Sequence, residues 1–147
     1  MPSETIAIAS DHAGFELKTT LKRELADQGF EVLDLGADSE ESVDYPDFGY
    51  DLASALKQGR AIRGVLVCGS GIGISIAANR HPEVRAALVH DAESAKLSRL
   101  HNDANVVCFA GRSIAPDQAK ECLAAFLHTE FEGGRHARRV EKLSQPR

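Results

Sequence analysis

Apolar residues along this chain follow two patterns in turn. Short apolar runs, most of them rich in β-branched residues, predict buried strands, and longer stretches with apolar residues three or four positions apart predict amphipathic helices. The first of the longer stretches carries Leu17, Leu21 and Leu25 on one side and is followed by Gly29. The predicted strands are residues 5–10, 30–35, 65–67, 84–90 and 106–110, and the predicted helices are residues 15–28, 47–58, 74–79, 91–100 and 116–128.

Strands that alternate with helices at this spacing predict a parallel sheet with helices on both faces. We therefore expect a single domain with a three-layer α/β/α, Rossmann-like fold and a five-stranded parallel sheet. In such folds ligands bind beyond the carboxyl ends of the strands. The polar groups predicted at this edge are residues 11–12, 68–73, 90–91 and 111–112.

The most informative stretch is residues 62–79. Its strand ends at Cys68, and Gly69, Gly71 and Gly73 then allow a sharp turn into the next predicted helix. Such a turn points backbone N–H groups and the positive end of the helix dipole at one spot, which favours an anion or an oxyanion. A thiol at this spot is expected to ionise more readily than a free one. The alternative is that Cys68 is a small buried apolar residue and that the glycines only close a tight turn.

Composition narrows the functional classes. The chain has 147 residues, 43% of them apolar, and a net charge of -5, which fits one globular domain and argues against general nucleic-acid binding. We find no signal-peptide pattern and no apolar run of membrane-spanning length. Cys68, Cys108 and Cys122 form no C-x-x-C pair, which suggests a reducing cytoplasm and excludes a disulfide framework or a cysteine zinc site. We expect Cys108 and Cys122 to pack in the core.

The C-terminal segment is basic although the chain as a whole is acidic. Arg135, Arg138 and Arg139 lie close together there, and Arg135 and Arg139 would share one face of a helix. Two guanidinium groups on one face suit bidentate binding of a phosphate. The alternative is a solvated basic tail.

Five short motifs occur together and in a fixed order along the chain. They are Asp11-His12-Ala13-Gly14, Asp44-Tyr45-Pro46, residues 68–79, residues 98–105 and Gly133-Gly134-Arg135-His136. On these residues the chain resembles the ribose-5-phosphate isomerase B family, in the wider group that includes galactose-6-phosphate and allose-6-phosphate isomerases. The resemblance runs from Ile6 to about Leu143.

The resemblance implies an aldose–ketose isomerase that interconverts ribose 5-phosphate and ribulose 5-phosphate through a cis-enediol, without a metal or another cofactor. It implies that Cys68 is the base that moves the proton and that Ser70 supports the site by hydrogen bonding. His101, together with Asp11, would open the furanose ring, and Asn102 would hold a sugar or enediolate oxygen. One branch of the family uses a Glu just after the third glycine; here that position is Ile74, and the cysteine is present.

The resemblance also implies the binding groups and the partner. The phosphate-binding positions are His12, Arg112, Arg135 and Arg139, and the backbone of Gly69, Ser70, Gly71, Ile72 and Gly73 would stabilise the enediolate oxygen. Members of the family are homodimers or dimers of dimers with shared active sites. The tail of about residues 131–147 would therefore reach a partner subunit.

Two alternatives remain open from the sequence. The same chemistry could act on allose 6-phosphate, galactose 6-phosphate or a tetrose phosphate, and residues 38–45 together with the tail would set the depth of the pocket. A more distant alternative is a non-catalytic, flavodoxin-like binding domain. Against it, Asp11 is the one acid at the end of the first strand, and Arg112 stands where a phospho-acceptor domain would need Lys.

Overall fold

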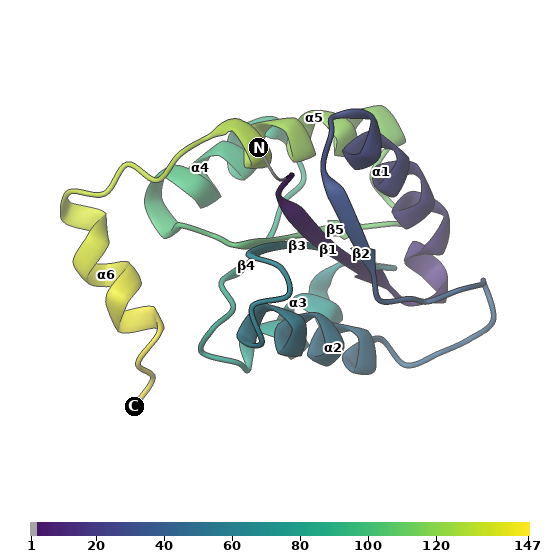
Figure 1. Cartoon of the computed structure of the whole chain (residues 1–147), viewed down its shortest axis with the longest axis horizontal. Helices are drawn as coiled ribbons and strands as arrows, with labels where there is room; N and C mark the ends of the chain where they lie inside the picture. The colour runs from purple at the N-terminus through teal and green to yellow at the C-terminus, as the bar shows by residue number, and fades with distance from the viewer. Residues whose placement is uncertain (1–2) are drawn as a thin grey trace.

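A five-stranded parallel sheet lies between two layers of helices in the computed structural model, which describes residues 3–147 (Figure 1). The predicted fold class is confirmed. The strands are β1 (Thr5–Ser10), β2 (Glu31–Asp34), β3 (Arg63–Cys68), β4 (Ala86–Leu88) and β5 (Val106–Ala110). The helices are α1 (Phe15–Asp27), α2 (Tyr45–Lys57), α3 (Ile72–Asn79), α4 (Ala92–Asn102), α5 (Pro116–His128) and α6 (Arg135–Leu143), with a 3-10 turn η1 (His12–Gly14) before α1.

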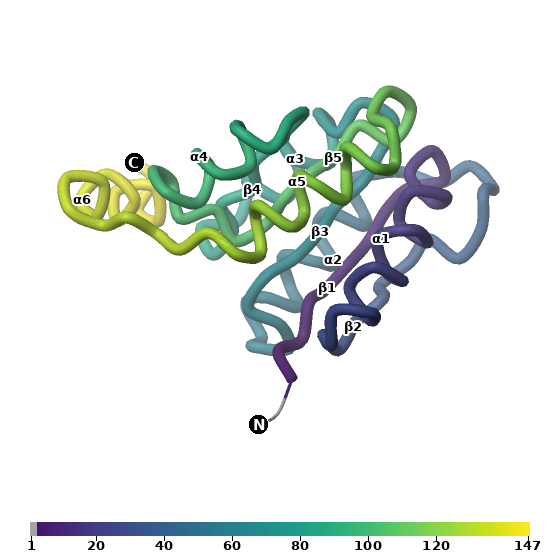
Figure 2. The backbone as a smooth tube through the Cα atoms, turned by 90° about the horizontal axis from the view of Figure 1, so that it is seen from above, coloured from purple at the N-terminus to yellow at the C-terminus, as the bar shows by residue number. Residues whose placement is uncertain are grey.

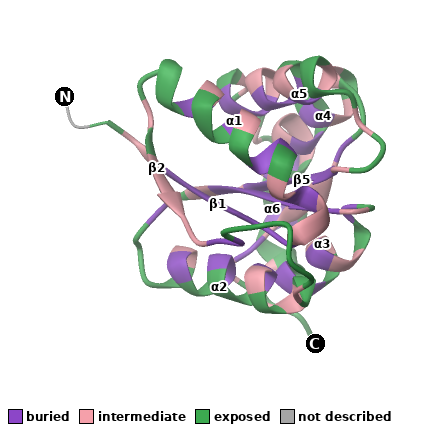
Figure 3. Ribbon diagram, turned by 90° about the vertical axis from the view of Figure 1, so that its right-hand side faces the viewer, coloured by how far each residue is buried: buried purple, intermediate pink, exposed green. Residues whose placement is uncertain are grey.

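Each face of the sheet has its own apolar core. Val65 and Val67 of β3 pack under α1, α4 and α5, whereas Leu66 and Cys68 point to the opposite face, under α2 and α3. This alternation follows from the two-residue period of a strand. Figure 3 shows the result, with buried residues in the strands and on the inward sides of the helices.

The order of the strands is β2-β1-β3-β5-β4, so β5 lies between β3 and β4. This differs from the 2-1-3-4-5 order of flavodoxin-like folds. The edge strand β4 is shorter than predicted. The polar side chain of Asn79 binds the backbone of Ala86 in the way that a neighbouring strand would. Its amide donates to Ala86 O at 2.9 Å and its Oδ1 accepts from Ala86 N at 2.8 Å.

Two helices differ from their predicted bounds at the site. Helix α3 begins at Ile72 instead of residue 74, directly after Gly71, whose φ is 75°. Helix α4 continues two residues past its predicted end, through His101 and Asn102. Asp103 caps its C-terminus with φ 48° and pairs with Arg99 at 2.9 Å. Its N-cap is Asp91, whose Oδ1 accepts from Ser94 N at 2.7 Å.

The C-terminal segment is a helix that stands out from the body of the molecule beside α4 (Figure 2). Helix α6 buries His136 and Val140 and leaves Arg135 and Arg139 exposed. The tail is therefore ordered by packing, which a purely solvated segment would lack. Within residues 3–147 there is no helix with the length and apolar character needed to cross a membrane.

Candidate active site

The loops that follow β1, β3 and β5 meet at the carboxyl edge of the sheet. Asp11 N donates to Val67 O at 3.2 Å, and Gly111 N donates to Cys68 O at 2.8 Å. The chain leaves β1 toward β2 on one side and leaves β3 toward β4, beyond β5, on the other, so the topological switch point of the sheet lies between the carboxyl ends of β1 and β3. Open α/β sheets bind ligands at such a switch point.

Asp11 and His12 directly follow β1 at this switch point. Asp11 is 6% exposed, and its Oδ1 accepts from Gly14 N at 3.0 Å, so it does cap the following turn. His12 Nδ1 accepts from Val43 N at 3.1 Å. A neutral imidazole that accepts at Nδ1 carries its proton on Nε2, which leaves His12 Nε2–H as a donor for a ligand.

Cys68 is the last residue of β3 and is 4% exposed. Burial alone does not distinguish it from Cys108 and Cys122, which are fully buried as predicted. Burial raises the pKa of Cys122 to about 11 and raises that of Cys108 further still. The position of Cys68 is what sets it apart, because the thiol stands where the strand opens into the glycine turn.

The turn after Cys68 has room only for glycine at Gly71. A Cβ there would lie 2.9 Å from the backbone carbon of Phe109, and the positive φ is itself unfavourable for other residues. Ser70 Oγ accepts from Ile72 N at 3.2 Å. Gly73 and Ile74 lie in the first turn of α3. Their backbone N–H groups have no acceptor within the helix and point toward the glycine turn that precedes it.

Arg112 brings a positive charge to the same edge. Its backbone N donates to Gly69 O at 3.1 Å, and a Cβ added at Gly69 would lie 2.9 Å from Arg112 Nη1. The guanidinium therefore covers the turn. Of the predicted phosphate-binding residues, Arg112 and His12 lie at the carboxyl edge of the sheet together with Cys68.

The other predicted residues lie at the opposite, amino edge. His101 and Asn102 end α4, and Arg139 faces them from α6 across a cleft of about 310 Å³. Arg135 is the exposed first residue of α6. Across the sheet, Gly64 pairs with Val106 just after α4, whereas Cys68 pairs with Ala110. Four strand steps of about 3.3 Å separate these pairs by about 13 Å, so one chain does not bring Cys68 and His101 together.

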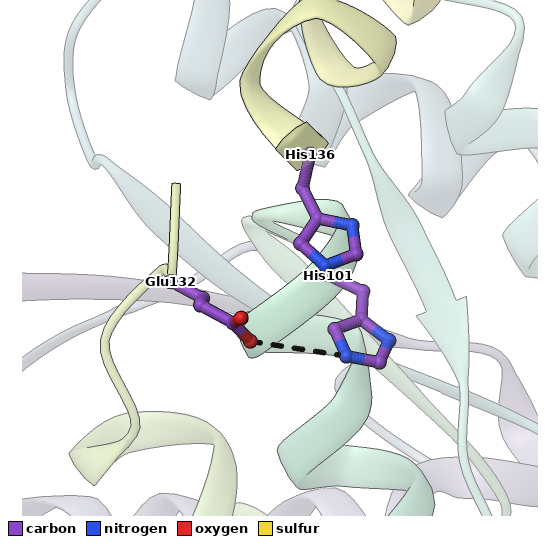
Figure 4. Close-up of side chains that lie close together, drawn as sticks. All are labelled: His101, Glu132 and His136. Carbon is purple, nitrogen blue, oxygen red and sulfur yellow. Dashed lines mark ion pairs between the residues drawn. The ribbon is translucent and has the colours of Figure 1, made fainter. Parts of the chain in front are cut away.

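Two residues beside His101 had no chemistry assigned from the sequence. The ring of His136 stacks on that of His101, with centroids 4.4 Å apart and planes 18° apart. Glu132 Oε2 lies 3.9 Å from His101 Nε2 (Figure 4). Burial lowers the pKa of His136, and the neighbouring His101 and Arg135 lower it further. The basic character of the C-terminal segment does not predict that His136 and Glu132 contact His101, because this contact depends on how α6 packs against α4.

The model of the ribose/galactose isomerase family matches residues 6–143. The chain belongs to this family. It is thus an isomerase of sugar phosphates, and the non-catalytic binding domain left open by the sequence is wrong.

Named relatives of this family are similar over nearly their whole length. Ribose-5-phosphate isomerase B of Escherichia coli is 43% identical over 95% of this chain and 93% of its own. D-erythrulose-4-phosphate isomerase of Pectobacterium atrosepticum is 44% identical over 95% of this chain and 92% of its own. The crystal structure of ribose 5-phosphate isomerase B from Thermotoga maritima superposes with a TM-score of 0.95 at 47% identity, covering 97% of this chain and 99% of that one.

Proposed function

We propose that this isomerase interconverts ribose 5-phosphate and ribulose 5-phosphate with Cys68 as the base. The observation that carries the proposal is the place of Cys68, which ends β3 at the topological switch point and opens into the glycine turn. The relatives named ribose-5-phosphate isomerase B support the choice of a pentose.

The proton transfer proceeds in two steps. The Cys68 thiolate takes the proton from C2 of the open-chain aldose, and negative charge develops on the oxygen of C1 as the cis-enediolate forms. The N–H groups of the turn stabilise this oxygen. A proton then passes from O2 to O1 of the cis-enediolate, and the thiol returns its proton to C1. These transfers give the ketose, with its carbonyl at C2, and restore the thiolate. Ser70 holds the turn through Ile72 N, and Asn102 binds a sugar oxygen.

The phosphate is held from both sides of the shared site. His12 and Arg112 come from the chain that supplies Cys68, and Arg135 and Arg139 come from a second copy. The second copy also supplies His101, which opens the furanose ring together with Asp11. Charge-assisted hydrogen bonds from the guanidinium groups hold the sugar in the site through its phosphate.

A homodimer, alone or as half of a dimer of dimers, completes the site. Ile72 and Ile76 lie one turn apart on α3, directly after the glycine turn, and are 54% and 57% exposed. Large exposed apolar side chains one turn apart suit contact with another chain. Cys68, Cys108 and Cys122 are all free, which supports a reducing compartment such as the cytoplasm.

A tetrose phosphate is the second candidate substrate, because the Pectobacterium atrosepticum relative is named for erythrulose 4-phosphate at a similar identity. The test is a panel of ribose 5-phosphate, erythrulose 4-phosphate, allose 6-phosphate and galactose 6-phosphate. We expect kcat/KM to be highest for ribose 5-phosphate by about tenfold or more. A higher kcat/KM for another sugar phosphate would overturn ribose 5-phosphate as the substrate but not the isomerase reaction. No turnover of any of the four sugars would overturn both the substrate and the reaction.

A further inference from the structure

His101, Glu132 and His136 form a cluster that the isomerase reaction uses only through His101. We infer that these three side chains bind a divalent transition-metal ion, best matched by Zn²⁺, and that the bound ion inhibits the enzyme. Two imidazoles and one carboxylate are a donor set that proteins use for zinc with a fourth position open. The three side chains come from the end of α4, the loop before α6 and the first turn of α6.

The donor atoms already lie close together. One ligand atom from each residue falls within 4.8 Å of the others, and Figure 4 shows both rings beside the Glu132 carboxylate. Zinc bonds of about 2.0–2.2 Å in a tetrahedron place the ligand atoms roughly 3.4 Å apart. His101 Nε2 and Glu132 Oε2 lie 3.9 Å apart, and both side chains are free to rearrange because they are 40% and 54% exposed.

His136 supplies an independent sign of a missing ligand. Its side chain is 6% exposed, and its Nε2 is buried with no hydrogen-bond partner among residues 3–147. An unsatisfied buried polar atom destabilises the fold, so buried nitrogens are almost always paired. A metal ion at Nε2 would satisfy this atom.

The backbone holds the three residues in place. Glu132 N donates to Leu100 O at 3.2 Å, which ties the loop to α4, and His136 N donates to Gly133 O at 3.1 Å. The two rings are stacked, so one must turn before both can face the same ion. His101 is the ring that turns, because His136 is enclosed. Arg139 lines the same cleft and opposes a cation, so we expect an affinity on the order of 10 µM, well below that of a structural zinc site.

Inhibition rests on the proposed function, whereas metal binding does not. An imidazole that holds zinc through Nε2 cannot exchange a proton with the sugar at that nitrogen. Zinc at this cluster would therefore remove the ring-opening group from the shared site. Cys68 is a second possible zinc ligand in the protein, and the experiment separates the two.

Binding is measured by calorimetry with ZnCl₂ and untagged, chelator-treated full-length protein. We expect one Zn²⁺ per chain for the wild type, for Cys68→Ser and for the control Glu130→Gln, which alters an exposed glutamate outside the cluster. Glu132→Gln should weaken binding by about tenfold or more through loss of one ligand. Glu132 is chosen because it is exposed and its replacement leaves the fold intact. No binding by the wild type, or equal binding by Glu132→Gln, would overturn the site.

Turnover gives the second readout. Basal turnover in the presence of EDTA tests the proposed function by itself. We expect added Zn²⁺ to inhibit the wild type and Glu130→Gln reversibly, and to inhibit Glu132→Gln only at concentrations about tenfold higher or more. Zinc that binds at the cluster and leaves turnover unchanged would overturn the inhibition.

Discussion

The aromatic ring of Tyr45 lies against the Cα of Gly73, and a Cβ at Gly73 would meet the ring edge. Tyr45 is 42% exposed, so its ring can swing away. Gly71 has no such freedom, since a Cβ there would meet the backbone of Phe109 at 2.9 Å. The backbone conformation and packing of the turn therefore require glycine at position 71, whereas Gly73 only makes room for the ring of Tyr45.

We expect Gly71→Ala to cost about 3 kcal/mol of unfolding free energy, because left-handed strain adds to overpacking. Gly73→Ala should change the unfolding free energy by less than about 1 kcal/mol, since a better helix former offsets the displaced ring. Urea unfolding of both variants measures the difference. Equal losses would mean that the turn around Gly71 rearranges freely.

The shared site predicts complementation between two inactive variants. Cys68→Ala and His101→Ala should each lose turnover by about a thousandfold or more while remaining folded. In a hybrid dimer one site keeps both residues, so random mixing of equal amounts should restore about a quarter of the wild-type activity. The chains are unfolded together, refolded and assayed.

Each variant refolded alone is the control for that mixture. Activity that stays at the level of the single variants would show that Cys68 and His101 do not act in one site formed by two chains.

The tail offers a matched pair of arginines. Arg139 lines the cleft with His101, whereas Arg138 is exposed elsewhere on α6. Arg139→Ala should raise KM by about tenfold to a hundredfold, as expected for the loss of a charged hydrogen bond of about 1.5–3 kcal/mol. Arg138→Ala should leave KM nearly unchanged. Steady-state kinetics on ribose 5-phosphate measures the KM of both variants. An equal increase in both would mean that Arg139 acts only through its positive charge and does not bind the phosphate directly.

Lys18 and Asp34 predict a pH-dependent stability. Lys18 is 2% exposed and its Nζ lies 2.7 Å from Asp34 Oδ1. Desolvation raises the pKa of Asp34, but hydrogen bonds from Lys18, the backbone of Gly36 and Lys22 outweigh it, so the pKa is lowered overall from 3.8. A carboxyl with a lowered folded-state pKa stabilises the fold above its unfolded pKa, and this stability is lost as the pH falls through the folded pKa.

Asp34→Asn should therefore cost about 3 kcal/mol at pH 7, because it leaves a buried ammonium unpaired. The difference from the wild type should shrink below about pH 4, where the wild-type carboxyl also becomes protonated. Thermal unfolding across this range measures it. Lys22→Ala is the control, since Lys22 is 48% exposed on its side chain and should matter little. A difference that does not change with pH would contradict the linkage.

The sequence by itself determined the alternation of strands and helices, the cap at Asp91 and the glycine turn after Cys68. These features depend on residues that are neighbours along the chain, through side-chain periodicity, capping and backbone freedom. The residue types of the candidate site were also readable, because Asp11 directly follows a strand, Cys68 ends one and Arg112 lies two residues after one.

Only the tertiary structure decided which of these residues meet. The insertion of β5 between β3 and β4, the separation of His101 from Cys68 and the contact of Glu132 with His101 join segments that are distant in sequence. Such contacts follow from how whole elements pack against one another, and a periodic pattern in one segment carries no information about the partner that covers it.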